Sequence, residues 1–91
     1  HQSARDAIIE LVNDKQAGVR NSIIWALNQA WKEGLPRDYV LRILRSALAD
    51  QSKKVRLQAL KISDMLELKE LVGELELRLE MEKHEDVVKS L

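Results

Sequence analysis

The chain has 91 residues, in which 15 Lys and Arg balance 15 Asp and Glu, and it contains no Cys. Without Cys it forms no disulfide, no thiolate metal site and no cysteine nucleophile. No apolar run approaches the roughly 20 residues that a membrane span needs, and the zero formal charge argues against a strongly basic nucleic-acid arm. With no secretory signal at its start, we expect one small cytoplasmic, intracellular domain that contacts no membrane.

Composition and apolar spacing predict an all-helical protein. The chain holds only 3 Gly and 1 Pro, and the strong helix formers Leu, Ala, Glu, Lys and Arg dominate it. Apolar residues recur three or four positions apart in five successive segments, which predicts helices over about 4–12, 19–31, 40–48, 55–66 and 68–79. Ser3 is a candidate N-cap for the first of these helices.

The junctions between these segments differ in strength. The polar breaks at 13–16 and 50–52 each hold an Asp suited to capping the next helix, and Gly34 with Pro36 separates the second helix from the third. Around 67–69 there is neither Gly nor Pro, so a single bent or continuous helix is an alternative to a break there. The segment 84–86 predicts a last break, after which 87–91 would begin a sixth helix barely one turn long.

The chain contains an internal repeat. Residues 11–20 match residues 47–56 at an offset of 36, and in each copy an Asp is followed five residues later by a Val-Arg pair: Asp14 with Arg20, and Asp50 with Arg56. A fainter third copy covers 79–88 at an offset of 32, with Val88 in place of the arginine. A helix pair repeated at this period cannot bury its apolar faces alone, so stacked copies would build one continuous core.

At these residues the chain resembles the HEAT-repeat family of armadillo-type helical repeats, whose signature is an apolar helix end, an Asp, and a Val-Arg pair one turn into the second helix. The resemblance covers essentially the whole chain. It implies an all-α fold, a short right-handed α-solenoid of about two and a half helical hairpins with five or six helices. It implies a single domain over 1–91, with repeats at about 3–34, 35–67 and 68–91, the last being incomplete or a cap.

The resemblance also implies roles for the repeated residues. The Asp would cap the second helix of its repeat and pair with the Arg of a neighbouring repeat, so that the ladder is formed by Asp14, Arg20, Asp50 and Arg56. In the third copy Glu82 replaces the Asp and caps less well, and Val88 cannot make the ladder contact. The C-terminal copy is therefore expected to be a degenerate cap or to be cut short.

Trp25 is the clearest candidate for a contact residue. At about 100° per residue it points away from the apolar stripe of its helix, on a polar face, whereas Trp31 flanks that stripe and is expected in the core. In HEAT-like stacks the second helix of each pair lines a concave surface, here predicted to consist of Asn21, Trp25, Asn28, Lys32, Leu57, Lys61 and Met65. Trp and Met are common interface anchors. The alternative is that a neighbouring repeat of a longer protein covers Trp25.

Leu77 and Met81 lie four residues apart on a face that opposes the main stripe of their segment. We favour burial of this face against 87–91, and the alternatives are self-association through these two residues or docking of a further repeat. Charge is also unevenly distributed, because seven basic and two acidic residues lie within 37–61, and nine acidic and three basic residues within 64–86. The basic block could bind phosphates, although a solvated helix surface is the commoner role of such residues. The uneven charge distribution could also orient a charged partner.

The sequence shows no pattern for catalysis. It has two His, no phosphate-binding Gly loop and no nucleophile elbow, so we expect no enzyme activity, catalytic residue, cofactor or metal site. The leading hypothesis is a protein-protein interaction or scaffold module that binds another protein on its concave surface. The alternatives are nucleic-acid binding, as in HEAT-like DNA alkylation-repair proteins, which chain length and net charge disfavour, and a structural fragment of a longer solenoid.

Overall fold

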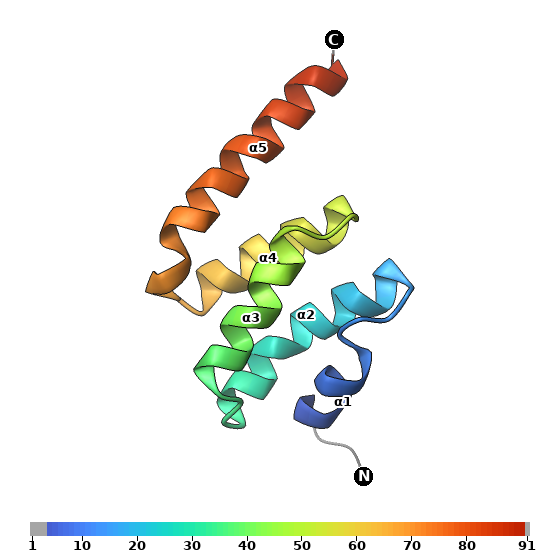
Figure 1. Cartoon of the computed structure of the whole chain (residues 1–91), viewed down its shortest axis with the longest axis vertical. Helices are drawn as coiled ribbons and strands as arrows, with labels where there is room; N and C mark the ends of the chain where they lie inside the picture. The colour runs from blue at the N-terminus through green and yellow to red at the C-terminus, as the bar shows by residue number, and fades with distance from the viewer. Residues whose placement is uncertain (1–3, 91) are drawn as a thin grey trace.

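The computed structural model describes residues 4–90 of the chain, and these residues are arranged almost entirely in helices (Figure 1). The elements are α1 (Ala4–Leu11), α2 (Ala17–Lys32), α3 (Arg37–Leu48), α4 (Lys53–Met65), the 3-10 helix η1 (Lys69–Leu71) and α5 (Val72–Ser90). Residues 4–90 form no strand, which confirms the prediction of an all-α protein. The predicted cap Ser3 lies outside the described residues.

The apolar stripes of the first four helices meet in one core. α2 packs against α1, α3 and α4, and α4 packs against α3 as well, so that α2 and α4 lie side by side (Figure 1). The buried apolar residues of the described part are Ile8, Ile23, Ile24, Leu27, Ala30, Leu35, Val40, Leu41, Ile43, Leu44, Ala47, Leu48, Val55, Ala59, Ile62, Leu68 and Leu71. Trp31 is half-buried and packs against this core.

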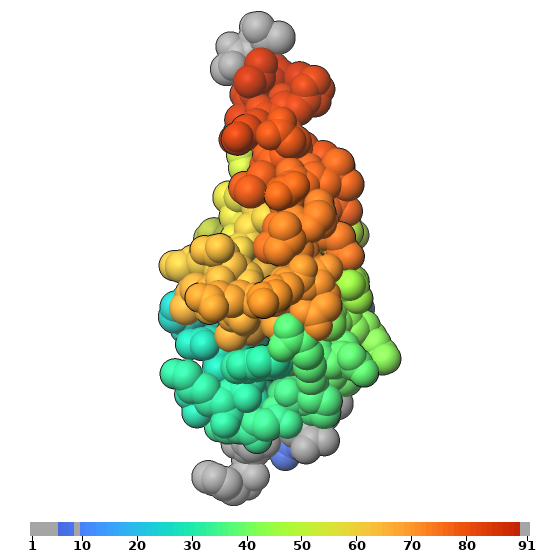
Figure 2. Space-filling model, turned by 90° about the vertical axis from the view of Figure 1, so that its left-hand side faces the viewer, coloured from blue at the N-terminus to red at the C-terminus, as the bar shows by residue number. Residues whose placement is uncertain are grey.

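α5 is the longest helix and is attached differently from the others. Of the core residues in the described part, none comes from α5; its nearest are Leu68 and Leu71, which precede it. The helix follows η1, extends along the body and forms the upper end of the molecule in Figure 2. The described chain is consequently elongated, with principal extents of 49 × 29 × 15 Å.

The two repeated Asp residues shape the turns that precede α2 and α4. The Oδ1 atom of Asp14 accepts the backbone N–H of Gln16 at 2.8 Å, and Oδ1 of Asp50 accepts that of Ser52 at 2.8 Å. Gln16 and Ser52 are the N-cap residues, and neither caps its helix with its side chain. The Asp carboxylates therefore hold the turn before each helix and do not occupy the N-cap position that we predicted for them.

The chain breaks between α4 and α5 although no Gly or Pro is present there. Glu67 adopts a left-handed conformation with φ of 51°, and Leu68 and Leu71 are buried on either side of the first turn of η1. Burial of these two leucines holds the chain in a conformation that Glu67 would not choose by itself. The alternative of one continuous helix through 67–69 is not what forms.

The break predicted at 84–86, and the sixth helix after it, are wrong. α5 continues through this segment to Ser90, and Leu91 lies outside the described residues. The segment contains no Gly or Pro, and Lys89 pairs with Glu85 one turn earlier at 3.0 Å, a spacing that stabilises a helix. A polar cluster was mistaken for a junction because helix surfaces are polar too.

No helix of the described chain is both long enough and apolar enough to cross a membrane.

Candidate functional site

Arg20 of α2 joins the first helical pair to the second. Its Nε and Nη2 atoms donate to the two carboxylate oxygens of Asp50, each at 2.9 Å, and its Nη1 atom donates to the backbone carbonyls of Asp14 and Lys15 at 2.9 and 3.0 Å. The hydrogen bond from Arg20 lowers the pKa of Asp50, with a further contribution from the backbone N–H of Ser52. The pairing of Arg20 with Asp50 is the contact that the HEAT resemblance implies.

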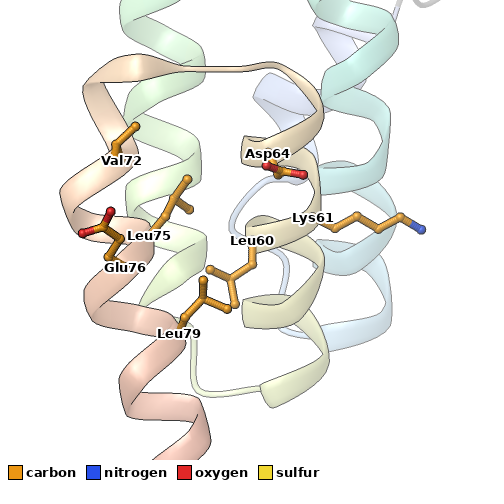
Figure 3. A pocket seen from close by; sticks show the side chains of 7 residues that line it. All are labelled: Leu60, Lys61, Asp64, Val72, Leu75, Glu76 and Leu79. Atoms are coloured by element: carbon orange, nitrogen blue, oxygen red, sulfur yellow. The ribbon is translucent and has the colours of Figure 1, made fainter.

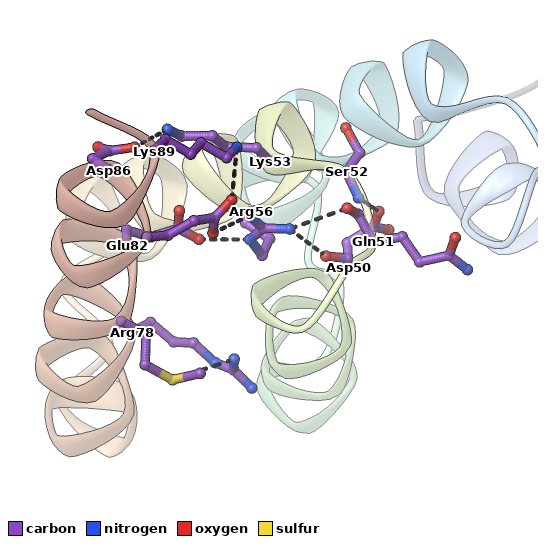
Figure 4. Close-up of polar contacts among 11 residues, drawn as sticks. Asp50, Gln51, Ser52, Lys53, Arg56, Arg78, Glu82, Asp86 and Lys89 are labelled. Atoms are coloured by element: carbon purple, nitrogen blue, oxygen red, sulfur yellow. Dashed lines mark hydrogen bonds and ion pairs between the residues drawn. The ribbon is translucent and has the colours of Figure 1, made fainter. Parts of the chain in front are cut away.

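Arg56 of α4 makes the same kind of contact one step further along the chain (Figure 4). Its Nη1 atom donates to the carbonyls of Asp50 and Gln51 at 3.0 and 3.1 Å, its Nε to Glu82 at 2.5 Å and its Nη2 to Glu85 at 3.0 Å. Hydrogen bonding to Glu82 raises the pKa of Arg56. Each arginine thus binds the loop before its own helix and a carboxylate from the following pair, and Glu82 takes the place that Asp50 has one repeat earlier.

Three more ion pairs connect the body to η1 and α5. Arg37 binds Glu70 at 2.5 and 2.6 Å, Arg45 binds Glu74 at 2.9 Å, and Lys53 binds Asp86. The hydrogen bonds from Arg37 lower the pKa of Glu70 to about 2.

The basic block and the acidic block therefore neutralise each other within the molecule. Of the seven basic residues in 37–61, four are paired with acidic residues of η1 or α5, namely Arg37, Arg45, Lys53 and Arg56. Most of the basic surface that the sequence suggested for binding phosphates therefore forms ion pairs that attach α5. Sequence reasoning missed these pairs, although the opposite charge of the two blocks was the available signal.

The predicted concave surface consists of residues on α2 and α4. Trp25 is 50% exposed, and the ammonium group of Lys61 lies 5.3 Å from the centre of its ring, which brings the two helices together at this point. On α4, Leu57 and Met65 lie one turn before and one turn after Lys61 and are 44% and 47% exposed. Of the other predicted residues on α2, Asn21 and Asn28 are half-buried and Lys32 is exposed.

A cleft that the sequence did not reveal lies between α4 and α5 (Figure 3). It has a volume of about 540 Å³ and is lined by Leu60, Lys61, Asp64, Val72, Leu75, Glu76 and Leu79. The side chains of Leu60, Leu75 and Leu79 point toward one another, while that of Lys61 extends to the far side of α4, away from α5. Lys61 thus borders the cleft at its place on α4, while its ammonium group lies over Trp25 on the other side of that helix.

Val72 and Leu79 belong to the apolar spacing that predicts a helix over 68–79, but they are 50% and 47% exposed. The reason is that α5 faces the body mainly through charged side chains, so that these two apolar residues form the outer wall of the cleft. The acids of the cleft, Asp64 and Glu76, form no ion pair within the described residues. The cleft is therefore apolar inside, and its rim is acidic.

The favoured prediction, burial of Leu77 and Met81 against 87–91, is wrong. The two side chains are 61% and 48% exposed. The helix does not fold back at 84–86, and residues 87–90 continue α5 instead of returning over this face. Val88, at 53% exposed, extends the same face toward the end of the helix. A shallow depression on this face is lined by Glu80, Met81, His84, Glu85, Val88 and Lys89.

Within residues 4–90, no group of three or more His, Asp and Glu side chains is placed to hold a metal ion. Comparison of the chain with protein-family models, with curated proteins and with solved structures found no match in any of the three.

Proposed function

We propose that this chain is a non-catalytic, HEAT-like interaction module that binds another protein on its concave surface. The observation that carries the proposal is the half-exposed Trp25 of α2, held by Lys61 of α4, with the exposed Leu57 and Met65 one turn on either side of Lys61. The concave surface comprises Asn21, Trp25, Asn28, Lys32, Leu57, Lys61 and Met65.

The repeated role of the two arginines supports the HEAT-like part of the proposal. Arg20 and Arg56 are 36 residues apart, lie at the same place in successive helical pairs and bind matching sets of carbonyl and carboxylate oxygens. α2 and α4, the helices that carry them, also lie side by side (Figure 1). A stack of α1–α2, α3–α4 and α5, with the last pair incomplete, is the short right-handed solenoid that we propose.

The chemistry of the surface supports a protein as the partner. Trp25 offers a large ring that is held in place by Lys61, and a held anchor loses little conformational freedom on binding. The cleft on the other side of α4 can accept an apolar side chain, and the unpaired acids Asp64 and Glu76 at its rim would attract a basic one. A partner helix with one bulky apolar residue flanked by Lys or Arg fits these features.

The test is photo-crosslinking in the source cells, with a photoreactive residue placed at Leu57. Its products are compared between the otherwise unchanged chain and the variant Trp25→Ala/Lys61→Ala. Because both side chains are exposed, helicity and melting temperature should stay unchanged. We expect the crosslinked partner to be lost in the double variant.

The matched control is Arg42→Ala/Lys54→Ala, which removes two exposed cations that form no ion pair within the described part of the chain. This variant should retain the crosslinked partner. Retention by Trp25→Ala/Lys61→Ala, or equal loss in the control, would refute the assignment of the site.

Nucleic-acid binding has no comparable support, because four of the seven basic residues that could contact phosphates are engaged by carboxylates of η1 and α5. Duplex DNA titrated at low salt, where phosphate contacts are strongest, tests this alternative. We expect no binding.

A further inference from the structure

α5 carries a second apolar stripe on the side away from the body. Leu77, Met81, His84 and Val88 are separated by four, three and four residues, which is the spacing of a coiled-coil seam. Leu77, Met81 and Val88 are 61%, 48% and 53% exposed. At about 100° per residue, the stripe lies roughly 140° around the helix from Glu82, which faces Arg56.

This stripe is separate from the proposed partner-binding surface. Leu79 and Val72, which line the cleft, lie about 150° or more around the helix from the mean direction of the stripe. An occupant of one surface therefore leaves the other open.

The charges at the edge of the stripe indicate what could cover it. Arg78 and Glu85 are seven residues apart on the same edge, where flanking residues of a coiled coil meet. The guanidinium group of Arg78 forms no ion pair within the described residues, and its polar contact is with the sulfur of Met81 at 3.7 Å. The cation at this edge therefore remains available for a carboxylate from another molecule.

We propose that a second copy of this chain covers the stripe, with its α5 packed antiparallel. In that orientation Arg78 of each copy lies beside Glu85 of the other, and Leu77 of each copy faces Val88 of the other. Glu85 already binds Arg56 and Lys89 of its own chain, so each Arg78 would join an existing ion-pair cluster. A parallel, in-register pair would instead place Glu80 of each copy beside Glu85 of the other, and two acidic pairs would repel. The charge pattern thus selects the antiparallel dimer.

The dimer is expected to be weak. Three half-exposed apolar residues per copy form a contact well below the roughly 800 Å² per partner of standard interfaces, and His84 places a polar group in the seam. We therefore expect a Kd on the order of 100 µM. Replacing His84 by Leu should complete the seam and tighten the dimer by about tenfold or more, since a buried leucine side chain contributes in each copy.

Sedimentation velocity of the 91-residue chain between about 10 µM and 1 mM tests the proposal, because this range brackets the expected Kd. The unchanged chain should shift from monomer to dimer across it, His84→Leu should shift at tenfold lower concentration, and Met81→Glu should stay monomeric. Leu57→Glu is the matched control, as an exposed apolar residue of the concave surface, and it should dimerise like the unchanged chain.

Orientation is tested by disulfide formation, since the chain has no Cys of its own. When Leu77→Cys and Val88→Cys chains are mixed under oxidising conditions, an antiparallel dimer gives the mixed 77–88 disulfide, whereas a parallel dimer gives 77–77 and 88–88. A monomer at 1 mM for both the unchanged chain and His84→Leu, loss of the dimer in Leu57→Glu, or predominance of 77–77 would each overturn the proposal.

Discussion

At the scale of single residues, the most heavily used side chains are Arg20 and Arg56. Each guanidinium group binds two backbone carbonyls of the loop before its helix, together with one or two carboxylates from the next part of the chain. Hydrogen bonds to charged groups contribute roughly 1.5–3 kcal/mol, about twice the value of neutral ones. One side chain therefore closes a loop and joins it to the following helices, which accounts for its return after 36 residues.

Ser63 is a residue whose removal should stabilise the fold. It is fully buried on α4, and its hydroxyl has no hydrogen-bond partner within the described residues. Ser63→Ala removes this unpaired polar group, and we expect the free energy of unfolding to rise by about 1 kcal/mol in urea denaturation. The exposed Ser46→Ala corrects for the better helix propensity of Ala. A decrease for Ser63→Ala would show that the hydroxyl is paired.

Glu67 is held in the left-handed region, with φ of 51°. This conformation costs a residue with a β-carbon roughly 1–2 kcal/mol, and Gly avoids the cost but loses more chain entropy on folding. We expect Glu67→Gly to be more stable than Glu67→Ala by about 1 kcal/mol in thermal or urea unfolding. Equal stability of the two variants would mean that the left-handed turn is not populated.

At the scale of elements, α5 differs from the four helices before it in what holds it. α1 to α4 share an apolar core, whereas α5 is attached by ion pairs from Arg45, Lys53 and Arg56 and by the partly buried Leu75. These ion pairs differ greatly in burial. Arg56 and Glu82 are 15% and 10% exposed, while Arg45 and Glu74 are 48% and 45% exposed.

This difference in burial predicts unequal effects of two matched substitutions. Arg56→Gln leaves Glu82 buried without its cation, and we expect a loss of about 3 kcal/mol in the free energy of unfolding. Arg45→Gln removes an exposed pair and should cost about 0.5 kcal/mol or less. Urea denaturation followed by circular dichroism measures both. Similar effects would show that α5 is held by something other than the Arg56 cluster.

At the scale of the whole molecule, a chain of zero formal charge is built from a basic and an acidic block that meet face to face. Positive and negative charges therefore cancel within this contact as well as over the whole chain. Asp64 and Glu76, which form no ion pair within the described residues, lie around the cleft. Because ion pairs attach η1 and α5 to the body, we expect the position of α5, and with it the shape of the cleft, to depend on the ionisation of paired carboxylates such as Glu70 and Asp86.

Acid should therefore release α5. Arg37 lowers the pKa of Glu70 to about 2, and Lys53 lowers that of Asp86. Because these carboxylates bind protons more weakly in the folded state, the unfolded state takes up more protons as the pH falls. Their stabilisation is complete above about pH 5 and is lost as the pH falls toward 2.

Hydrogen exchange should show lost protection in α5 before α2 over this range, and 1 M NaCl at pH 7 should act in the same direction. Stability that is constant from pH 5 to pH 3 would contradict this prediction.

Sequence reasoning succeeded where local rules dominate and failed where distant segments compete. The helices containing Ile23 and Leu44 follow from apolar periodicity, and the end of α2 follows from Gly34, whose φ is 91°. The break near Glu67 separates the two predicted helices 55–66 and 68–79, but a continuous helix stayed an alternative because no Gly or Pro marks the break and buried leucines impose it. Of the candidate site, Trp25 and Lys61 were predicted, but the cleft beside them was not, since it depends on how far α5 stands from α4.

By itself, the sequence determined that the chain is helical, the phase of its repeat and the positions of the two arginines, because these depend on residue spacing within a helix or a loop. Only the tertiary structure decided that Glu82 receives Arg56, and that Leu77, Met81 and Leu79 stay exposed. α5 carries apolar residues on more than one face, and a helix that docks on one side of a body can bury only one of them. The ion pairs from Arg45, Lys53 and Arg56 determine which face of α5 packs against the body.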